Sequence, residues 1–128
     1  KDLEYFVYKP IKSLVDFIRQ KKTISICFPR NINSYKEFVD NVNPDIISID
    51  YNVDPSIIRD TIDIPVQGGL DPKILLQNKE IVRNEVTKYL KTFDKKRYIF
   101  NLGHGVLPET NPDMVRYLVD EVRSFNGQ

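Results

Sequence analysis

The stretch Tyr98-Ile-Phe-Asn-Leu-Gly-His-Gly-Val-Leu-Pro-Glu-Thr-Asn-Pro112 decides the fold of this chain. It predicts a short apolar strand that runs into a histidine flanked by glycines, followed by a helix that an Asn-Pro pair opens. Gly103 and Gly105 allow a sharp turn and leave space beside the imidazole of His104. Ligands of α/β proteins bind at this end of a strand, so His104 is the leading candidate for a site residue.

The alternation of strand and helix patterns extends over the whole chain. The predicted strands are Thr23–Phe28, Asp45–Asp50, Ile64–Gln67 and Tyr98–Leu102. The predicted helices are Leu3–Ile18 with an interruption at Pro10, a helix starting near Asn33 or Ser34, a turn at Pro55–Asp60, Lys79–Phe93 and Pro112–Phe125. The strands are continuous apolar runs, which predicts parallel strands with both faces covered and right-handed crossovers.

Two architectures fit this order of elements. Four parallel strands can form a small open sheet, or they can be half of a (β/α)8 TIM barrel, for which about 250 residues is typical. Periodicity and composition alone do not separate the two. In either case, a chain of 128 residues is long enough for one domain at most.

Composition excludes several classes of function. Lys and Arg number 19 and Asp and Glu number 18, so no strong field attracts nucleic acid or an anionic membrane. No apolar run approaches the roughly 18 residues that span a bilayer. Cys27 is the single cysteine, which fits a reducing cytosol. Because the chain begins without a methionine, we expect it to be a piece of a longer protein.

Further candidates stand where the predicted strands end. Arg30 can bind a carboxylate through two parallel hydrogen bonds, and Asp50 can orient a ligand or transfer a proton. Asp54 and Asp71 each precede a proline, which makes the N-cap of a helix their simplest role. Cys27 lies inside a strand and is most simply a small apolar residue. One histidine and one cysteine cannot supply the three or four ligands of a zinc site, so we expect no metal.

Three motifs occur in order at suitable spacing. They are Ile49-Asp-Tyr-Asn-Val-Asp-Pro55, Val66-Gln-Gly-Gly-Leu-Asp-Pro72 and Phe100-Asn-Leu-Gly-His-Gly-Val-Leu-Pro-Glu-Thr110. Together they resemble the carboxyl-terminal portion of the uroporphyrinogen decarboxylase family, and the similarity runs over nearly the whole chain. Two residues depart from the family pattern: Gly69 stands where the family usually has Asn, and Tyr51 stands where it usually has Trp.

The resemblance implies an α/β fold, the cofactor-free (β/α)8 TIM barrel. Residues 1–128 would be approximately the C-terminal four βα units, which form the C-terminal half of a single barrel domain. It also implies a cytoplasmic, homodimeric carboxy-lyase of haem and porphyrin biosynthesis. Such an enzyme decarboxylates the four acetate side chains of uroporphyrinogen III to give coproporphyrinogen III, with a protonated pyrrole as the electron sink.

The resemblance assigns only one site residue to this chain. His104 matches the family histidine that contacts a substrate carboxylate, whereas the family's catalytic aspartate and arginines lie upstream of Lys1. We therefore expect no catalytic residue and no activity in this chain alone. The two edges of a half-barrel should also promote pairing with other chains, along Thr23–Phe28 or Tyr98–Leu102.

Two other classes of function stay open at this point. A corrinoid or thiol methyltransferase of the same barrel superfamily would bind zinc through histidine and cysteine. Ser25, however, stands where a His-x-Cys pair ending at Cys27 would need its histidine. The chain can also be read as a standalone α/β binding module without enzymatic activity.

Overall fold

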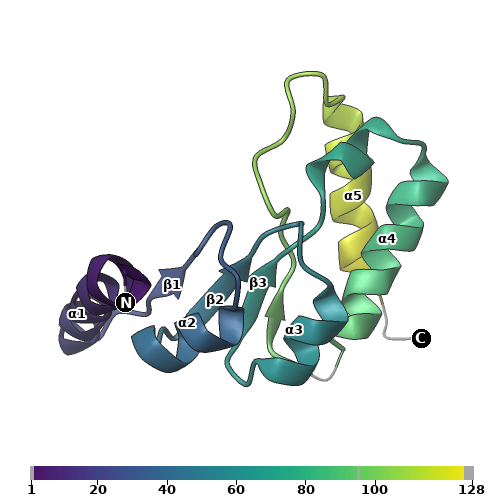
Figure 1. Ribbon diagram of the computed structural model, residues 1–128. Helices are drawn as coiled ribbons and strands as arrows, with labels where there is room; N and C mark the ends of the chain where they lie inside the picture. Colours follow the sequence, from purple (N-terminus) through teal and green to yellow (C-terminus); the bar gives the residue numbers. More distant parts are fainter. Residues whose placement is uncertain (1, 95, 126–128) are drawn as a thin grey trace.

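The computed structural model describes residues 2–94 and 96–125 and consists of one parallel sheet with helices packed against it (Figure 1). The strands are β1 (Ile26–Cys27), β2 (Ile46–Ile49), β3 (Val66–Gly68) and β4 (Tyr98–Ile99). The helices are the π-helix η1 (Glu4–Tyr8), α1 (Lys9–Gln20), α2 (Tyr35–Val42), α3 (Pro55–Thr61), the 3-10 helix η2 (Pro72–Leu76), α4 (Lys79–Thr92) and α5 (Pro112–Ser124).

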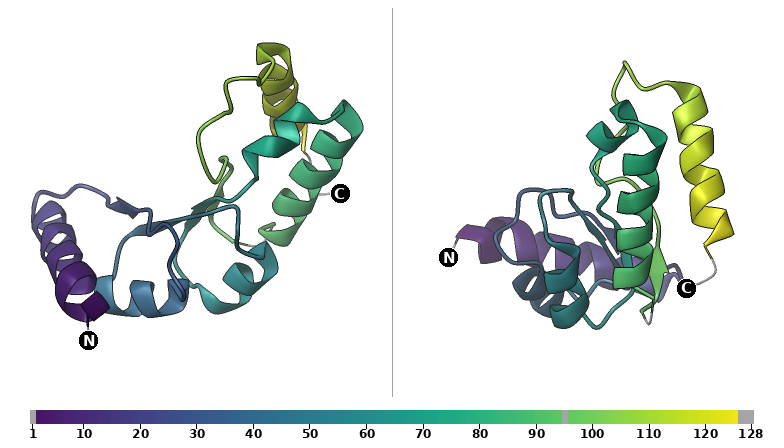
Figure 2. Two further views of the ribbon diagram at one scale, coloured as in Figure 1. Left: turned by 45° about the horizontal axis from the view of Figure 1, so that its top comes forward. Right: turned by 90° about the vertical axis from the view of Figure 1, so that its right-hand side faces the viewer.

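The strand order decides between the two architectures that the sequence leaves open. The strands lie side by side in the order β1-β2-β3-β4, and every neighbouring pair is parallel. The row of strands is curved, and the helices follow one another along its convex side (Figure 2). A doubly wound sheet reverses its strand order at a switch point, whereas a barrel pairs each strand with the next along the chain. The chain therefore forms part of a (β/α)8 TIM barrel, as the resemblance implies.

The register of the strands sorts side chains onto two faces. Ile47 pairs with Val66 on the face that the helices cover, and both are almost completely buried. Ser48 pairs with Gln67, and Gln67 pairs with Ile99, on the opposite, inner face. The expectation that both faces are covered is wrong for the described residues, because Ile99 is 43% exposed. A barrel covers its inner face only when the ring of strands is complete.

The helix starts confirm the capping residues that the sequence predicts. The side chains of Ser34, Asp54, Asp71, Asn78 and Asn111 accept hydrogen bonds from backbone N–H groups at the starts of α2, α3, η2, α4 and α5. Asp54 and Asp71 therefore have the capping role that was their simplest interpretation. The helix η2 is a feature that the sequence patterns did not predict.

The ends of the sheet differ from the predicted boundaries. The strand expected over Thr23–Phe28 pairs only at Ile26–Cys27, because β1 is an edge strand and has a neighbour on one side. The strand expected over Tyr98–Leu102 ends at Ile99, although an isolated bridge joins Leu70 to Leu102. Each edge strand thus keeps a short ladder, and the rest of its apolar run is irregular.

The first helix changes its geometry where a proline interrupts the pattern. The N–H of Lys9 donates to the carbonyl of Glu4, which is a π-type bond over five residues, and α1 begins at Lys9. Pro10 then follows within the same continuous helical stretch, since Tyr8 and Lys9 both have helical dihedral angles, and its missing N–H removes one hydrogen bond to the preceding turn. The interruption expected at Pro10 is therefore a change from π- to α-helix.

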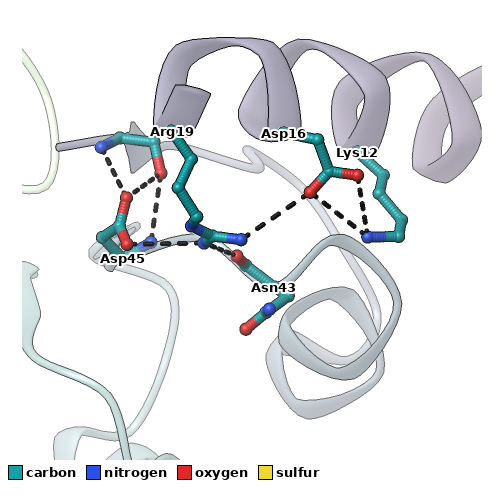
Figure 3. A network of polar contacts seen from close by, with 6 residues as sticks. Lys12, Asp16, Arg19, Asn43 and Asp45 are labelled. Atoms are coloured by element: carbon teal, nitrogen blue, oxygen red, sulfur yellow. Dashed lines mark hydrogen bonds and ion pairs between the residues drawn. The ribbon is translucent and has the colours of Figure 1, made fainter. Parts of the chain in front are cut away.

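A network of polar contacts fastens α1 to the start of the sheet (Figure 3). The carboxylate of Asp45 accepts hydrogen bonds from the backbone N–H and the hydroxyl of Ser25, at 2.8 and 2.7 Å. Arg19 of α1 donates to the carbonyl of Asn43 at 2.7 Å and lies 3.4 Å from an oxygen of Asp45. The Ser25 hydrogen bonds, followed by Arg19, lower the pKa of Asp45 against the effect of burial.

We expect Asp45→Asn to lower the free energy of unfolding by about 1–2 kcal/mol near neutral pH, because a partly exposed carboxylate loses charge-assisted hydrogen bonds. The pKa of Asp45 is lower in the folded chain than its ordinary 3.8. Its contribution is therefore complete above the ordinary pKa and is lost as the pH falls through the folded pKa. Urea unfolding between about pH 2 and 7 measures both effects.

Asp16→Asn is the matched control, because Asp16 makes only exposed contacts with Lys12 and Arg19 in the same network. We expect it to change the free energy of unfolding by about 0.5 kcal/mol or less. Equal effects of the two substitutions at all pH values would contradict the assignment.

The loop after β4 packs directly on the loop after β2. A Cβ atom added at Gly103 would lie 2.5 Å from the backbone nitrogen of Tyr51 and 3.0 Å from the carbonyl carbon of Asp50. The N–H of Gly103 also donates to the carbonyl of Leu70 at 2.8 Å. Any side chain at this position would push the two loops apart. By contrast, a Cβ added at Gly105 meets no atom within 4 Å.

We expect Gly103→Ala to destabilise the chain by about 1–3 kcal/mol, the usual cost of overpacking. The matched control is Gly105→Ala, which should change the free energy of unfolding by about 0.5 kcal/mol or less. Urea unfolding of the two variants measures the difference. If both variants unfold at the same urea concentration, the close approach at Gly103 is not what fixes the loop.

Candidate functional site

A hollow of about 500 Å³ lies on the inner face, where the strands end. It is lined by Ile26, Phe28, Arg30, Ser48, Gln67, Asn101, Leu102, Gly103, His104 and Gly105. These residues come from all four strands or from the loops that follow them. The carboxyl ends of parallel strands meet at one edge of a sheet, which is why residues far apart in the sequence share this hollow. We call this space the hollow below.

Two of the polar lining residues project from the strands themselves. Ser48 of β2 and Gln67 of β3 stand opposite each other in the register, and the amide Nε2 of Gln67 donates to Ser48 Oγ at 3.4 Å. Sequence analysis did not single out either residue as part of a site. A serine between two isoleucines in an apolar strand is the signal that could have identified Ser48.

The structure places His104 on the wall of the hollow, as its position after β4 predicts. The side chain is exposed, and Nδ1 lies 3.4 Å from the carbonyl oxygen of Gly105, which is a long contact. The imidazole is therefore open to a ligand. Its predicted contact with a substrate carboxylate stays a prediction.

Arg30 borders the same hollow from the opposite edge of the sheet. Its Nε lies 3.6 Å from Oδ2 of Asp50, which makes an ion pair but is too long for a hydrogen bond. The arginine side chain is 49% exposed and the aspartate side chain only 3% exposed. The structure thus brings together His104 and Arg30, which the sequence singled out separately, and it places Asp50 behind Arg30.

A buried tyrosine of α2 holds the backbone behind this pair. The N–H of Asp50 donates to the hydroxyl oxygen of Tyr35 at 2.9 Å. Burial raises the pKa of Tyr35, so the hydroxyl stays protonated near neutral pH. Tyr35 is also buried in the core, so it packs there while its hydroxyl fixes the end of β2. Its place on a helix gave no signal of that second role.

Two further tyrosines fix the Gly68–Gly69 turn at the end of β3. The hydroxyl of Tyr98 donates to the carbonyl of Gly68 at 2.9 Å, and the hydroxyl of Tyr89 donates to the carbonyl of Gly69 at 2.6 Å. Burial is the largest cause that raises both pKa values, and it brings that of Tyr89 to about 12. Both hydroxyls therefore act as permanent donors to the turn.

The two departures from the family pattern have separate structural explanations. Gly69 has a φ of +113°, and an added Cβ would lie 2.9 Å from side-chain carbons of Ile49 and Tyr89. Glycine therefore suits this conformation better than a residue with a side chain. Tyr51 is not among the residues that line the hollow, and it borders a separate depression together with Asn52. The second departure thus changes a neighbouring surface.

Cys27 is turned away from the hollow. It pairs with Ile47, on the face that the helices cover, and it is half-buried against the core. Burial, followed by the charge of Asp45, raises the pKa of its thiol. A raised thiol pKa reduces the thiolate fraction that nucleophilic or metal chemistry requires. Its neighbour Ser25 donates its hydroxyl hydrogen to Asp45.

Residues 2–94 and 96–125 contain neither a candidate metal site nor a candidate membrane-spanning helix. Within those ranges, no three His, Cys, Asp or Glu side chains group in a way that could hold a metal ion. None of the helices described combines the length and the apolar character that crossing a membrane requires.

Comparison with known proteins gives consistent matches. A model of the uroporphyrinogen decarboxylase (URO-D) family matches residues 1–125. The uroporphyrinogen decarboxylase of Rickettsia felis is 39% identical over 124 residues, which cover 94% of this chain and 36% of the relative. The corresponding protein of Rickettsia canadensis is 38% identical, with coverages of 94% and 37%, and that of Rickettsia bellii is 37% identical, with coverages of 98% and 38%.

The chain spans little more than a third of the length of these curated relatives, somewhat less than the half that we expected. Within that length it folds into four consecutive strands of a barrel. The family match covers almost every residue, and the fold is the one that the resemblance implies. The chain therefore belongs to the uroporphyrinogen decarboxylase family.

Proposed function

We propose that this chain is part of a uroporphyrinogen decarboxylase, a carboxy-lyase of porphyrin and haem biosynthesis. The reaction removes carbon dioxide from the four acetate side chains of uroporphyrinogen III and gives coproporphyrinogen III. The observation that carries the proposal is the match to relatives of that name over 94% of the chain. We also propose, from the same family, a cytoplasmic homodimer that needs no cofactor.

The chemistry of the hollow supports this substrate. Its lining combines apolar side chains, Ile26, Phe28 and Leu102, with the hydrogen-bond donors Arg30 and His104. No acidic side chain is among the lining residues described. A flat macrocycle with many carboxylates needs apolar contact for its rings and donors for its anionic edge. Aspartate or glutamate in the wall would repel such a ligand.

The role that we propose for this chain is binding and orientation. Loss of carbon dioxide leaves an electron pair, which the protonated pyrrole of the substrate takes up. A proton then adds to the resulting methylene carbon to give the methyl group, and the ring loses its extra proton. Residues of this chain would hold carboxylates at the rim while that pyrrole is protonated, and a donating His104 would strengthen one such contact. The catalytic aspartate and arginines that the family implies lie upstream of Lys1, so this chain supplies no proton donor to the ring.

The zinc-dependent methyltransferase alternative is not favoured. The matching family model and the Rickettsia relatives named above all carry the name uroporphyrinogen decarboxylase. In addition, Cys27 faces the helices, and the Ser25 hydroxyl is bonded to Asp45. Neither side chain is presented to the hollow.

The proposal predicts that the 128-residue chain alone does not decarboxylate uroporphyrinogen, because preorganised groups for the transition state are missing. It also predicts activity in a chimera in which this chain replaces the matching segment of the Rickettsia felis relative. Coproporphyrinogen formation, measured after oxidation to the porphyrin, tests both. The parent relative is the control for the assay. A folded, monodisperse chimera without turnover would contradict the proposed function.

In the active chimera, we expect His104→Asn to lower the rate about tenfold or less, since one charge-assisted hydrogen bond is lost and others remain. The order in which the acetates are decarboxylated should change more than the overall rate does, and this change would be visible as accumulated, partly decarboxylated intermediates. The control is Val106→Ala, at an exposed position of the same loop. Complete loss of turnover would make His104 an essential proton donor, and no effect on rate or intermediates would make it a structural residue.

A further inference from the structure

A buried carboxylate, that of Asp50, lies beside the guanidinium of Arg30. Oδ1 of Asp50 accepts a hydrogen bond from the N–H of Tyr51 at 2.8 Å. Oδ2 accepts no hydrogen bond from any described residue and lies 3.6 Å from Nε of Arg30. A buried carboxylate oxygen without a hydrogen bond needs a nearby positive charge, because burial strongly disfavours an isolated anion. Asp50 therefore draws the Nε edge of the guanidinium towards the end of β2.

Asp50 itself cannot move freely. Its backbone N–H is bonded to Tyr35, its residue is 2% exposed, and its carbonyl carbon lies against Gly103. The negative charge that attracts Arg30 is thus held in place by α2, by β2 and by the loop after β4. A guanidinium paired with such a fixed group loses little further freedom when it binds a ligand.

The rest of the guanidinium remains available on the side of the hollow. Arg30 makes no hydrogen bond to any residue in the described part of the chain, and its side chain is 49% exposed. Guanidinium carries five N–H donors in a planar fork, so pairing Nε with Asp50 leaves the outer donors free. These donors border a space whose lining contains no acidic side chain and has His104 in its wall.

We propose that Arg30 binds a carboxylate of the substrate directly and that Asp50 is the residue that positions it. This inference rests on the proposed function for the identity of the anion, but its geometry concerns any carboxylate that enters the hollow. Arg30 and His104 would then hold different carboxylates of one macrocycle from opposite edges of the sheet. The apolar side chains between them would contact the rings.

The test uses uroporphyrin, the oxidised and fluorescent form of the substrate, titrated against the 128-residue chain and against the active chimera. We expect Arg30→Gln to weaken binding about tenfold or more, because a bidentate charge-assisted contact is lost. Arg30→Lys keeps the charge but loses the fork, so we expect an intermediate loss of about threefold. In the chimera, the KM for uroporphyrinogen should rise with little change in kcat, as for an interaction made equally in the ground and transition states.

The matched control is Arg116→Gln, which removes the same charge from an exposed arginine of α5 that does not line the hollow. It should leave uroporphyrin binding within about twofold of the parent chain, if general electrostatic attraction is weak at ordinary salt. Arg30→Gln also leaves a buried carboxylate unpaired, so it can destabilise the chain. The double variant Arg30→Gln with Asp50→Asn removes both charges, and it should recover stability without recovering binding.

The positioning role of Asp50 has its own readout. Asp50→Asn should weaken uroporphyrin binding about threefold when Arg30 is present and should cause no further loss in the Arg30→Gln background. Independent losses from the two substitutions would show that Asp50 acts through general stability. Uroporphyrin affinity in Arg30→Gln equal to that of the parent would overturn the inference, and so would absence of binding to both the parent chain and the chimera.

The outcomes also separate this inference from the proposed function. If the chimera turns over uroporphyrinogen and Arg30→Gln leaves its KM unchanged, the proposed decarboxylase function stands and Arg30 does not bind the substrate. A folded chimera could instead bind uroporphyrin in a way that depends on Arg30 and yet show no turnover. That result would support the carboxylate site at Arg30 and contradict the proposed decarboxylase function.

Discussion

The contact between the Gly103 backbone and the Asp50–Tyr51 peptide is the constraint on which the site depends. A Cβ at Gly103 would lie only 2.5 Å from the Tyr51 nitrogen, so the two loops touch backbone to backbone. This contact sets how closely the loop that carries His104 approaches the end of β2. Because Asp50 also pairs with Arg30 and is held by Tyr35, one residue relates α2, the loop after β1 and the loop after β4.

The strand register then decides which side chains reach the hollow. In a parallel pair, residues opposite each other project to the same face, so Ser48 and Gln67 both project inward while Ile47 and Val66 project towards the helices. The helix-facing set is buried and carries the packing energy. The inner set is partly exposed and mixes polar with apolar side chains. The side chains that pack against the helices and those that line the hollow therefore alternate along the same strands.

Much of the fold could be predicted from the sequence, because its signals are local. Caps such as Asn78 and Asn111 fix helix starts, and apolar runs fix the strands to within a few residues. The choice between an open sheet and a barrel was not local, since it depends on strand order. The place of His104 and Arg30 on the hollow follows from their positions in loops after strands, and their role in binding stays a prediction. The contacts of Tyr35 and Gln67 join separate elements, and no spacing in the sequence encodes them.

A chain that covers about a third of its relatives can still contain a coherent part of a site, because barrels build their sites from separate loops. The loops described here present donors and apolar side chains, which are the means of recognising an anionic macrocycle. They present no acidic group to the hollow, and protonation of a ring requires an acid. Under the proposed function, recognition of the carboxylate rim and protonation of the pyrrole therefore fall on different strands of the barrel. Such a division explains why one segment can keep its binding geometry through its own backbone contacts, independently of the groups that perform the chemistry.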